Sequence, residues 1–352
     1  MKKRRIRTAC RYALGTVLIG CLLVILVKPL LIQKERTPVE KHGGLSVRGS
    51  NIVDENGEIF ILQGVSLHTL ERDADDQLLN EKTLCYIRDH WKVNAIRIAV
   101  PVSGHDSYSS STSARLRLME TVQYGIELAG RLGLYVIVDW HVLEDGNPLR
   151  HEKEARHFFG ALSEKYPDQD NILYEICNEP NGVKGSWTNI KKYAEEVIPV
   201  IRENSPEAVI IVGMPEWSSD PEPVMKQPLR GMENIVYSYH FYAATHKEDR
   251  REALKKALRT ELPVLVTEFG LCSAYGNGEP DMEEGERWLA LLDQYAVGRI
   301  CYGFFELDTG CALLRKNAGM DGEWNEESLT ATGKWLSDFY NSRRIPEMRS
   351  DG

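Results

Sequence analysis

The fold is decided by a helix–strand unit that reads, from Ala114 to Trp140, ARLRLMETVQYGIELAGRLGLYVIVDW in one-letter code. Its first part, Ala114–Leu132, repeats apolar residues three and four positions apart, which predicts an amphipathic helix. Its last part, Tyr135–Trp140, is a short apolar run of β-branched and aromatic residues, which predicts a buried strand. A helix followed directly by a buried strand is the repeating unit of a parallel α/β fold.

The same unit recurs on both sides of this stretch. The expected strands are Ile61–Val65, Ala95–Val100, Tyr135–Trp140, Ile172–Cys177, Val209–Val212, Ile235–Tyr239, Val264–Thr267 and Ile300–Phe305. The clearest helical patterns between them are Ala114–Leu132, Ile190–Arg202, Lys247–Arg259 and Glu283–Tyr295. Eight such alternations predict a single α/β domain over residues 45–345, folded as a (β/α)8 TIM barrel.

Residues at the start of this domain predict a further element. Within residues 51–62, the dipeptide Asn56-Gly57 separates two β-prone runs. Asn-Gly is the preferred pair for a tight turn between antiparallel strands, so an N-terminal β-hairpin is expected before the barrel. Residues 346–352 are assigned to a C-terminal tail.

The N-terminal segment has the pattern of a membrane anchor. Residues 1–11 form a basic tail, and residues 12–32 are apolar apart from Lys28, which is long enough for a transmembrane helix. The preceding positive charges predict a single-pass signal anchor in the cell membrane, with the body outside the cytoplasm. Residues 33–44 read as a linker. A cleaved signal peptide, giving a secreted protein, and a lipoprotein processed at Cys21 are the alternatives.

Composition excludes several classes of protein. The chain has 352 residues, of which 42% are hydrophobic and 27% charged, as in ordinary globular proteins. The first 36 residues carry a formal charge of +8 within a total of −9, so the remainder carries −17. A body this acidic repels nucleic acid. The seven cysteines are odd in number and form no C-x-x-C pair, so neither a disulfide scaffold nor a zinc ribbon is predicted.

Polar residues follow the predicted strands, where a barrel places its catalytic groups. Two glutamates, Glu179 after the fourth strand and Glu268 after the seventh, can meet across the barrel mouth. Cleavage of a glycosidic bond requires one protonated carboxyl group and one carboxylate, and this pair could supply both. The histidines lie on separate strands without the spacing of a metal site, and no glycine-rich phosphate loop is present, so no metal or cofactor is predicted.

Several motifs together resemble glycoside hydrolase family 5, the cellulase-type retaining hydrolases. They occur in order along the body and read LQGVSLH (62–68), NAIR (94–97), IVDWH (137–141), YEICNEPN (174–181), IVGMPEWS (211–218), YHFYA (239–243) and VTEFG (266–270). The resemblance implies that Glu179 is the general acid/base and Glu268 the nucleophile.

The same resemblance implies roles for other residues. Arg97 and Tyr242 would keep Glu268 ionised, and Asn178 would bind the sugar 2-hydroxyl. His68, His141 and His240 would contact a sugar or orient the carboxylates. Trp217 would be a stacking platform for the acceptor sugar, and Phe305 would be a platform under the reacting sugar. Some of these residues could instead have structural roles. His68 and His141 could be packing residues, Glu175 is expected to be a buried partner for a neighbouring strand, and Cys177 is expected to be a core residue.

Departures from the family pattern bear on the substrate. The stretch Phe305-Glu-Leu-Asp-Thr-Gly310 replaces the usual Trp-Ser-Leu-x-Asp-Lys, and Thr-Leu-Glu-Arg after His68 lacks an aromatic residue. We expect a retaining endo-β-1,4-glucanase that acts on a β-linked polysaccharide or oligosaccharide. Alternatives are a mannan-, xyloglucan- or oligosaccharide-directed hydrolase, a noncatalytic carbohydrate-binding membrane protein, and a metal-dependent hydrolase.

Overall fold

The computed structural model describes residues 36–67, 69–70, 78–167, 169–319, 322 and 324–342. The predicted transmembrane segment, residues 12–32, lies outside this part of the chain, as do His68 and the predicted C-terminal tail. Within the described residues, no helix combines the length and hydropathy needed to cross a bilayer.

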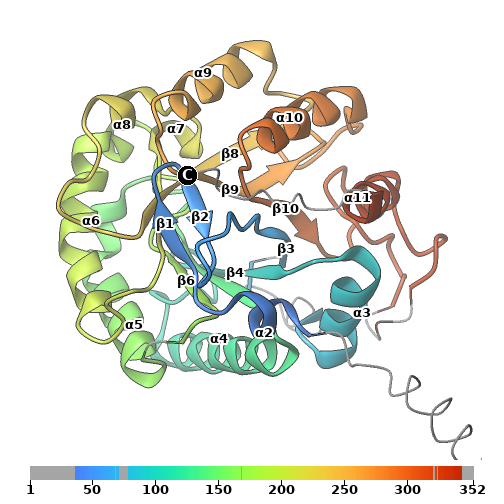
Figure 1. Cartoon of the computed structure of the whole chain (residues 1–352). Helices are drawn as coiled ribbons and strands as arrows, with labels where there is room; N and C mark the ends of the chain where they lie inside the picture. Colours follow the sequence, from blue (N-terminus) through green and yellow to red (C-terminus); the bar gives the residue numbers. More distant parts are fainter. Residues whose placement is uncertain are drawn as a thin grey trace, which may run out of the picture. The chain divides into compact units, whose positions relative to one another are not determined.

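Eight parallel strands close into a barrel in the order β10-β3-β4-β5-β6-β7-β8-β9, which confirms the predicted (β/α)8 fold. The strands are β3 (Gln63–Leu67), β4 (Ala95–Pro101), β5 (Tyr135–His141), β6 (Ile172–Glu175), β7 (Ile210–Gly213), β8 (Ile235–Tyr242), β9 (Val264–Gly270) and β10 (Arg299–Phe304). Their residues are almost all buried, because helices cover the outside of the barrel (Figure 1) and side chains fill the inside.

The helices surround the strands in chain order (Figure 1). The long ones are α3 (Glu81–Trp91), α4 (Thr112–Leu132), α5 (Glu152–Lys165), α6 (Trp187–Arg202), α9 (Glu248–Leu258), α10 (Met282–Gln294) and α11 (Ala331–Ser342). Short helices occur at η3 (Pro148–His151), η4 (Val183–Gly185), α7 (Pro215–Ser218) and α8 (Glu222–Lys226). The helix predicted from residue 114 begins two residues earlier, because Ser111 accepts a hydrogen bond from the Ala114 amide as an N-cap.

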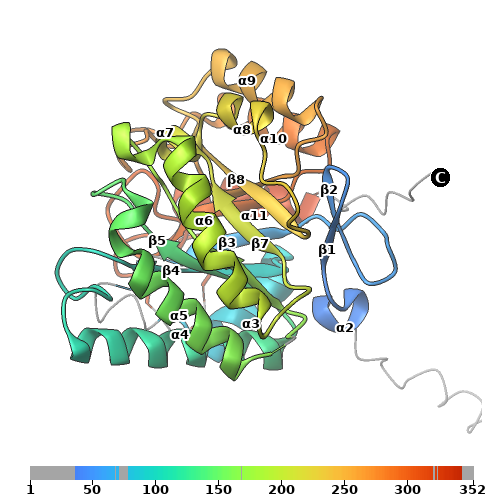
Figure 2. The same cartoon turned by 90° about the vertical axis from the view of Figure 1, so that its left-hand side faces the viewer.

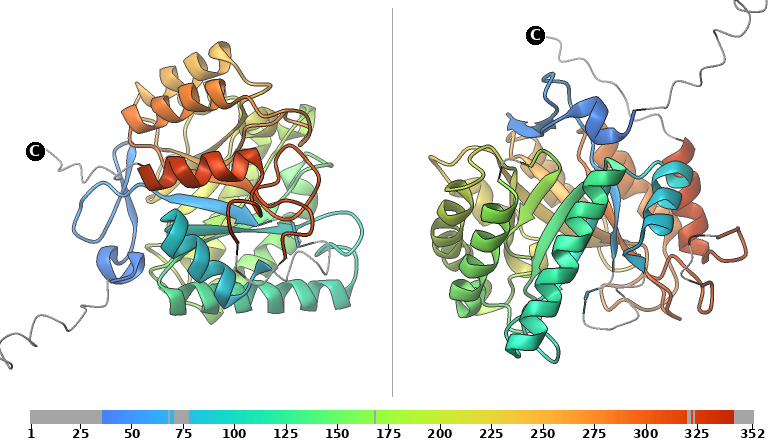
Figure 3. Two further views of the ribbon diagram at one scale, coloured as in Figure 1. Left: turned by 90° about the vertical axis from the view of Figure 1, so that its right-hand side faces the viewer. Right: turned by 90° about the horizontal axis from the view of Figure 1, so that it is seen from below.

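A small antiparallel pair lies at the amino-terminal end of the barrel (Figures 2 and 3). It joins β1 (Ser46–Arg48) to β2 (Asn51–Val53). The predicted hairpin was therefore wrong in its strands. The Asn56-Gly57 turn does form, but beyond it only Ile59 makes a bridge, to Val53. Apart from this bridge, the second β-prone run forms no strand, and its residues Phe60 and Leu62 are buried at the base of the barrel.

Part of the predicted linker is also structured. Residues Pro38–His42 form helix α2, which begins at a capping box in which Thr37 and Glu40 exchange hydrogen bonds. Gly43 ends the helix with a φ of 60°, a conformation that glycine adopts easily. The compact unit that contains the barrel begins at Thr37.

The barrel interior has an apolar lower half and a polar upper half. Apolar side chains of Leu62, Ala95, Tyr135, Ile137, Leu173, Ile211, Val236, Leu265 and Ile300 pack with Leu45, Ile52 and Phe60 at the amino-terminal end. Beyond Arg97, Asp139 and Glu175, buried polar groups take over toward the carboxyl ends of the strands. The lower half therefore stabilises the barrel, and the upper half holds the chemistry.

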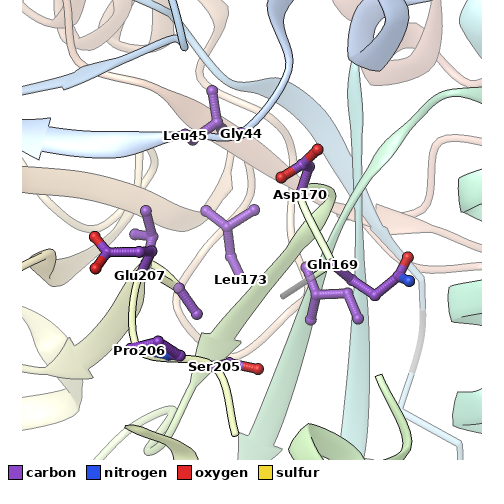
Figure 4. Close-up of a pocket in the computed structure, with 11 residues that line it drawn as sticks. Gly44, Leu45, Gln169, Asp170, Leu173, Ser205, Pro206 and Glu207 are labelled. Carbon is purple, nitrogen blue, oxygen red and sulfur yellow. The ribbon is translucent and has the colours of Figure 1, made fainter. Parts of the chain in front are cut away.

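A pocket of about 310 Å³ opens at the amino-terminal end, between Gly44-Leu45 and the segments that precede β6 and β7 (Figure 4). In Figure 4 the Leu173 side chain points into its centre, and the Asp170 and Glu207 carboxylates lie at its edges. The two glutamates of interest lie at the opposite end of the strands, so this pocket is not part of their site.

Candidate active site

Arg97 is the centre of the polar half of the barrel. Its side chain is completely buried on β4, and its nitrogens lie 2.6 Å from Glu175, 3.0 Å from Asp139 and 3.1 Å from Glu268. It also donates a 2.6 Å hydrogen bond to Oδ1 of Asn178. A buried cation is costly unless it is paired and fully hydrogen-bonded, and these acceptors satisfy that requirement. Arg97 thus fixes four side chains from the carboxyl ends of three strands, β5, β6 and β9.

Glu268, on β9, is held in its ionised form. Arg97 contacts Oε2, and the Tyr242 hydroxyl at the end of β8 donates a 2.5 Å hydrogen bond to Oε1. Burial alone would raise the pKa of Glu268, but the charges of His240, Arg97 and His141 and the bond from Tyr242 together lower it. This carboxylate is an anion with both oxygens oriented, as a nucleophile requires.

Glu179 lies in a different environment, just beyond β6. Burial and the negative charge of Glu268 raise its pKa, although a hydrogen bond with His240 opposes the shift. Nδ1 of His240 lies 2.9 Å from Oε1 of Glu179. The side chain is only 11% exposed, on the barrel's open end. A carboxyl group with a raised pKa can arrive protonated and deliver its proton.

The two carboxylates lie close together. Oxygens of Glu179 and Glu268 and a nitrogen of His240 lie within 4.8 Å of one another. Three such groups could ligate a cation, but the ring of His240 is already hydrogen-bonded to Glu179 and Thr267, and Arg97 supplies the positive charge beside Glu268. These contacts argue for a pair of carboxylates that act on a substrate between them.

A second layer of polar groups lies beneath the pair. The Thr267 hydroxyl donates a 2.6 Å hydrogen bond to Glu175 and lies 2.9 Å from Nε2 of His240. Burial would lower the pKa of His240, but the nearby carboxylates of Glu175, Glu179 and Glu268 raise it to about 9. Glu175 is confirmed as a buried partner, whereas the role of Thr267 was not predicted, because Thr267 precedes Glu268 and only strand register places it under His240.

His141, at the end of β5, is oriented by one neighbour. Its Nδ1 lies 2.7 Å from Oδ2 of Asp139, whose carboxylate also faces Arg97. Burial would lower the pKa of His141, but the charge and hydrogen bond of Asp139 raise it. The side chain of His141 is 9% exposed, so the edge of its ring that does not face Asp139 can reach the open end of the barrel.

Trp217 lies in a strained turn after β7. Glu216, Trp217 and Ser218 all have φ near 55°, a region that costs non-glycine residues free energy. The turn is held by the Trp217 amide, which donates to the Pro180 carbonyl at 3.2 Å, and by the Ser218 hydroxyl, which donates to the Asn178 carbonyl at 2.6 Å. Trp217 is 50% exposed beside the Glu179 loop. Such strain is typical of functional sites.

Phe305, the predicted platform under the reacting sugar, is almost completely buried. Its side chain is buried at 3% exposure and packs against Tyr302, with 5.3 Å between ring centroids. Tyr302 is half-buried on β10, and it lies close enough to Tyr242 to contribute to the raised pKa of that hydroxyl, after burial and the charge of Glu268. The role of Phe305 as a platform stays a prediction, and Tyr302 is a second aromatic residue beside it.

One disulfide was not predicted. Cys272, just after β9, is bonded to Cys311, after β10. Both cysteines are completely buried, and Cys177 is buried without a disulfide, as predicted for a core residue. The odd cysteine count and the spacing of 39 residues gave no sign of the bond, since it joins two loops that only the closed barrel brings together.

The site therefore unites Arg97, Asn178, Glu179, His240, Tyr242 and Glu268, with His141 beside them. A (β/α)8 barrel with two buried carboxyl groups, whose pKa values are shifted in opposite directions, at the carboxyl ends of its strands is typical of a class, the barrel glycoside hydrolases. Residues 53–304 match the sequence profile described as "Cellulase (glycosyl hydrolase family 5)". The chain belongs to glycosyl hydrolase family 5 and is a glycoside hydrolase.

Individual relatives agree with this assignment. The chain is 36% identical over 299 residues to endoglucanase A of Butyrivibrio fibrisolvens, covering 84% of this chain and 68% of that protein. It is 35% identical over 294 residues to an endoglucanase of Clostridium saccharobutylicum, covering 84% and 64%. The chain thus spans about two thirds of the length of these curated relatives.

A solved structure is similar over nearly the whole body. The catalytic domain of Thermobifida fusca endoglucanase Cel5A, in complex with cellotetraose, superposes with a TM-score of 0.81 and 35% identity. The match covers 87% of this chain and 100% of that domain.

Proposed function

We propose that this chain hydrolyses β-1,4-linked glucan with retention of anomeric configuration, using Glu268 as nucleophile and Glu179 as acid/base. The observation that carries the proposal is the pair of carboxylates within 4.8 Å whose pKa values are shifted in opposite directions. Retaining enzymes place the two groups roughly 5 Å apart, whereas inverting enzymes leave room for a water molecule. The endoglucanases among its relatives support glucan as the substrate.

The reaction follows from the two protonation states. Glu268 attacks the anomeric carbon while Glu179 donates its proton to the glycosidic oxygen, so the bond to the leaving sugar breaks as the bond to Glu268 forms. Glu179, now ionised, takes a proton from water, and the water oxygen displaces Glu268 from the anomeric carbon. Two inversions give net retention. Asn178 and His141 lie beside the pair and would bind hydroxyl groups of the reacting sugar.

Two aromatic residues would bind the flanking sugars. Trp217 is next to the Glu179 loop, so it would stack on the acceptor sugar that leaves from the acid side. Tyr302, in place of Phe305, would lie under the reacting sugar near Tyr242. The same barrel could serve a mannan or xyloglucan, because these contacts recognise a pyranose face more than one hydroxyl.

The substrate is tested by incubating the full chain with soluble cellulose derivatives, mixed-linkage glucan, xyloglucan and mannan, and analysing the products. We expect release of cello-oligosaccharides with a rapid fall in viscosity, and no release by the Glu268→Ala variant. If only mannan or only xyloglucan is cleaved, that polymer and not β-1,4-glucan is the substrate. A lack of products from every polymer and from aryl cellobiosides would favour a noncatalytic binding protein.

The pH profile should respond to His240. Activity falls on the acid side as Glu268, with its lowered pKa, becomes protonated, and on the alkaline side as Glu179, with its raised pKa, loses its proton. The positive charge of His240 lowers both pKa values. His240→Asn should therefore move both limbs of the kcat/KM profile to higher pH. Limbs that stay in place while activity falls would show that His240 does not set these pKa values.

We also propose that the body lies outside the cytoplasm, held by residues 12–32 as a single-pass membrane anchor. The basic flank before this apolar run supports the orientation. The Cys272–Cys311 disulfide adds support, because structural disulfides persist in oxidising compartments and are rare in the cytosol.

Fractionation of cells that express the full chain tests the anchor. We expect the protein in the membrane fraction, extracted by detergent but not by high salt, with its body digested by protease added outside. A soluble protein whose N-terminus lies beyond residue 28 would show a cleaved signal peptide. Labelled lipid on Cys21 would show a lipoprotein.

A further inference from the structure

Exposed apolar side chains are concentrated at one end of the barrel. Six large ones stand out among the described residues: Leu116, Tyr124, Leu143, Val183, Trp217 and Tyr275. The first two lie on α4, whereas the other four lie in or beside the loops that follow β5, β6, β7 and β9. Single exposed apolar residues are ordinary, but four around the carboxylate pair indicate a surface that binds something.

Tyr275 is the second aromatic residue among these four, after Trp217. Its side chain is 90% exposed, compared with 50% for Trp217. It lies in a tight turn in which the Ser273 amide donates to the Asn277 carbonyl at 3.0 Å and the Ser273 hydroxyl donates to Oδ1 of Asn277 at 2.8 Å. The Gly276 amide donates to the Ser273 carbonyl at 2.9 Å. The turn thus presents Tyr275 on a closed, hydrogen-bonded loop.

The base of this loop is fixed on both sides. The Cys272–Cys311 disulfide ties it to the loop after β10, and the Ala274 amide donates a 3.0 Å hydrogen bond to the Thr245 hydroxyl in the loop after β8. Gly310 packs so tightly that an added Cβ would lie 2.1 Å from the Gly278 carbonyl oxygen. A binding residue on such a support loses less conformational entropy when a ligand binds.

The position of the loop determines which part of a glucan it can reach. Trp217 is bonded to the Glu179 loop, on the side from which the leaving sugar departs. The Tyr275 loop follows the nucleophile strand and is bonded covalently to the loop after β10, the strand that carries Tyr302. The loop therefore lies with the nucleophile strand and β10, and the sugar that becomes bonded to Glu268 is on the nonreducing side of the cleavage point.

We propose that Tyr275 is a stacking platform for a glucose residue on the nonreducing side, beyond the two sugars next to the cleavage point. The inference rests on the proposed glucanase function. Its chemistry is that of an exposed phenol ring on a rigid support, which offers an apolar face to a pyranose and a hydroxyl to its rim. It would compensate for the lysine that Leu307-Asp308-Thr309 lacks on this side of the cleft.

The test uses the full chain and two aryl glycosides that differ by one nonreducing glucose, nitrophenyl β-cellobioside and nitrophenyl β-cellotrioside. For Tyr275→Ala we expect kcat/KM on the cellotrioside to fall about tenfold, equivalent to ~1.4 kcal/mol, mainly through KM. The cellobioside does not reach Tyr275, so its kcat/KM should change less than about twofold. Tyr275→Phe should retain most of the preference, because the ring face remains.

Two control variants test whether the effect is specific to Tyr275 and to the nonreducing side. Tyr124→Ala removes an exposed tyrosine on α4 and should leave kcat/KM on both aryl glycosides unchanged. Trp217→Ala should weaken the binding of cello-oligosaccharides that extend on the acceptor side. Equal loss on both aryl glycosides, or none on either, would overturn the platform while leaving the glucanase intact. If the parent chain cleaves neither glycoside, the proposed function fails, and the platform with it.

Discussion

Replacing Glu268 with alanine is expected to reduce the hydrolysis of β-glucan by at least ~10³-fold. The variant lacks the carboxylate that Arg97 and Tyr242 orient, and with it the first bond of the double displacement. Added azide should restore part of the rate with an activated aryl cellobioside, because a small anion can occupy the vacated space beside Arg97. Its direct attack gives a glycosyl azide of inverted configuration.

The controls separate loss of chemistry from loss of structure. Glu144→Ala removes an exposed glutamate near the same end of the barrel and should retain full activity. The Glu268→Ala protein should bind cellotetraose and unfold cooperatively. An azide product of retained configuration from this variant would show that another group performs the attack.

Glu179→Ala should fail in a different way. Loss of the proton donor should cost at least ~10³-fold on substrates with a poor leaving group, such as cello-oligosaccharides. The dinitrophenolate of a dinitrophenyl cellobioside leaves without a proton. This substrate should therefore still form the covalent intermediate with Glu268, which is seen as a rapid burst of dinitrophenolate. Azide should then attack this intermediate and give the glycosyl azide of retained configuration.

The contrast between the two variants assigns the roles. Retained azide from Glu179→Ala and inverted azide from Glu268→Ala identify the acid/base and the nucleophile. If both variants give the same azide, or if Glu179→Ala shows no burst with the activated substrate, the roles assigned from the pKa directions are wrong.

The barrel could be predicted because its strands are short apolar runs bounded by helical patterns. Strand ends were less predictable. The segment from residue 235 continues as a strand to Tyr242, since pairing with β9 extends to Gly270, while β6 ends at Glu175 so that the chain can turn and present Glu179. The Asn56-Gly57 turn was predicted correctly. The strand expected after it does not form, and Phe60 and Leu62 from that segment pack into the base of the barrel instead.

The site was predictable where its residues follow strands, because a closed barrel brings these ends together. Arg97, Glu179, Tyr242 and Glu268 meet for that reason. Thr267 and Tyr302 were not foreseen, since their positions depend on register within a strand and on which face each side chain takes. The Cys272–Cys311 bond depends on loops from neighbouring strands, which sequence spacing does not reveal.

The stereochemistry of the product tests most directly whether Glu179 and Glu268 hydrolyse the glycosidic bond by double displacement. Proton NMR of a cello-oligosaccharide digest, recorded before mutarotation, reports the anomer formed by the enzyme. The carboxylate separation predicts that the β-anomer appears first and that the α-anomer grows only later. Initial appearance of the α-anomer would show direct attack by water and would contradict the assigned mechanism.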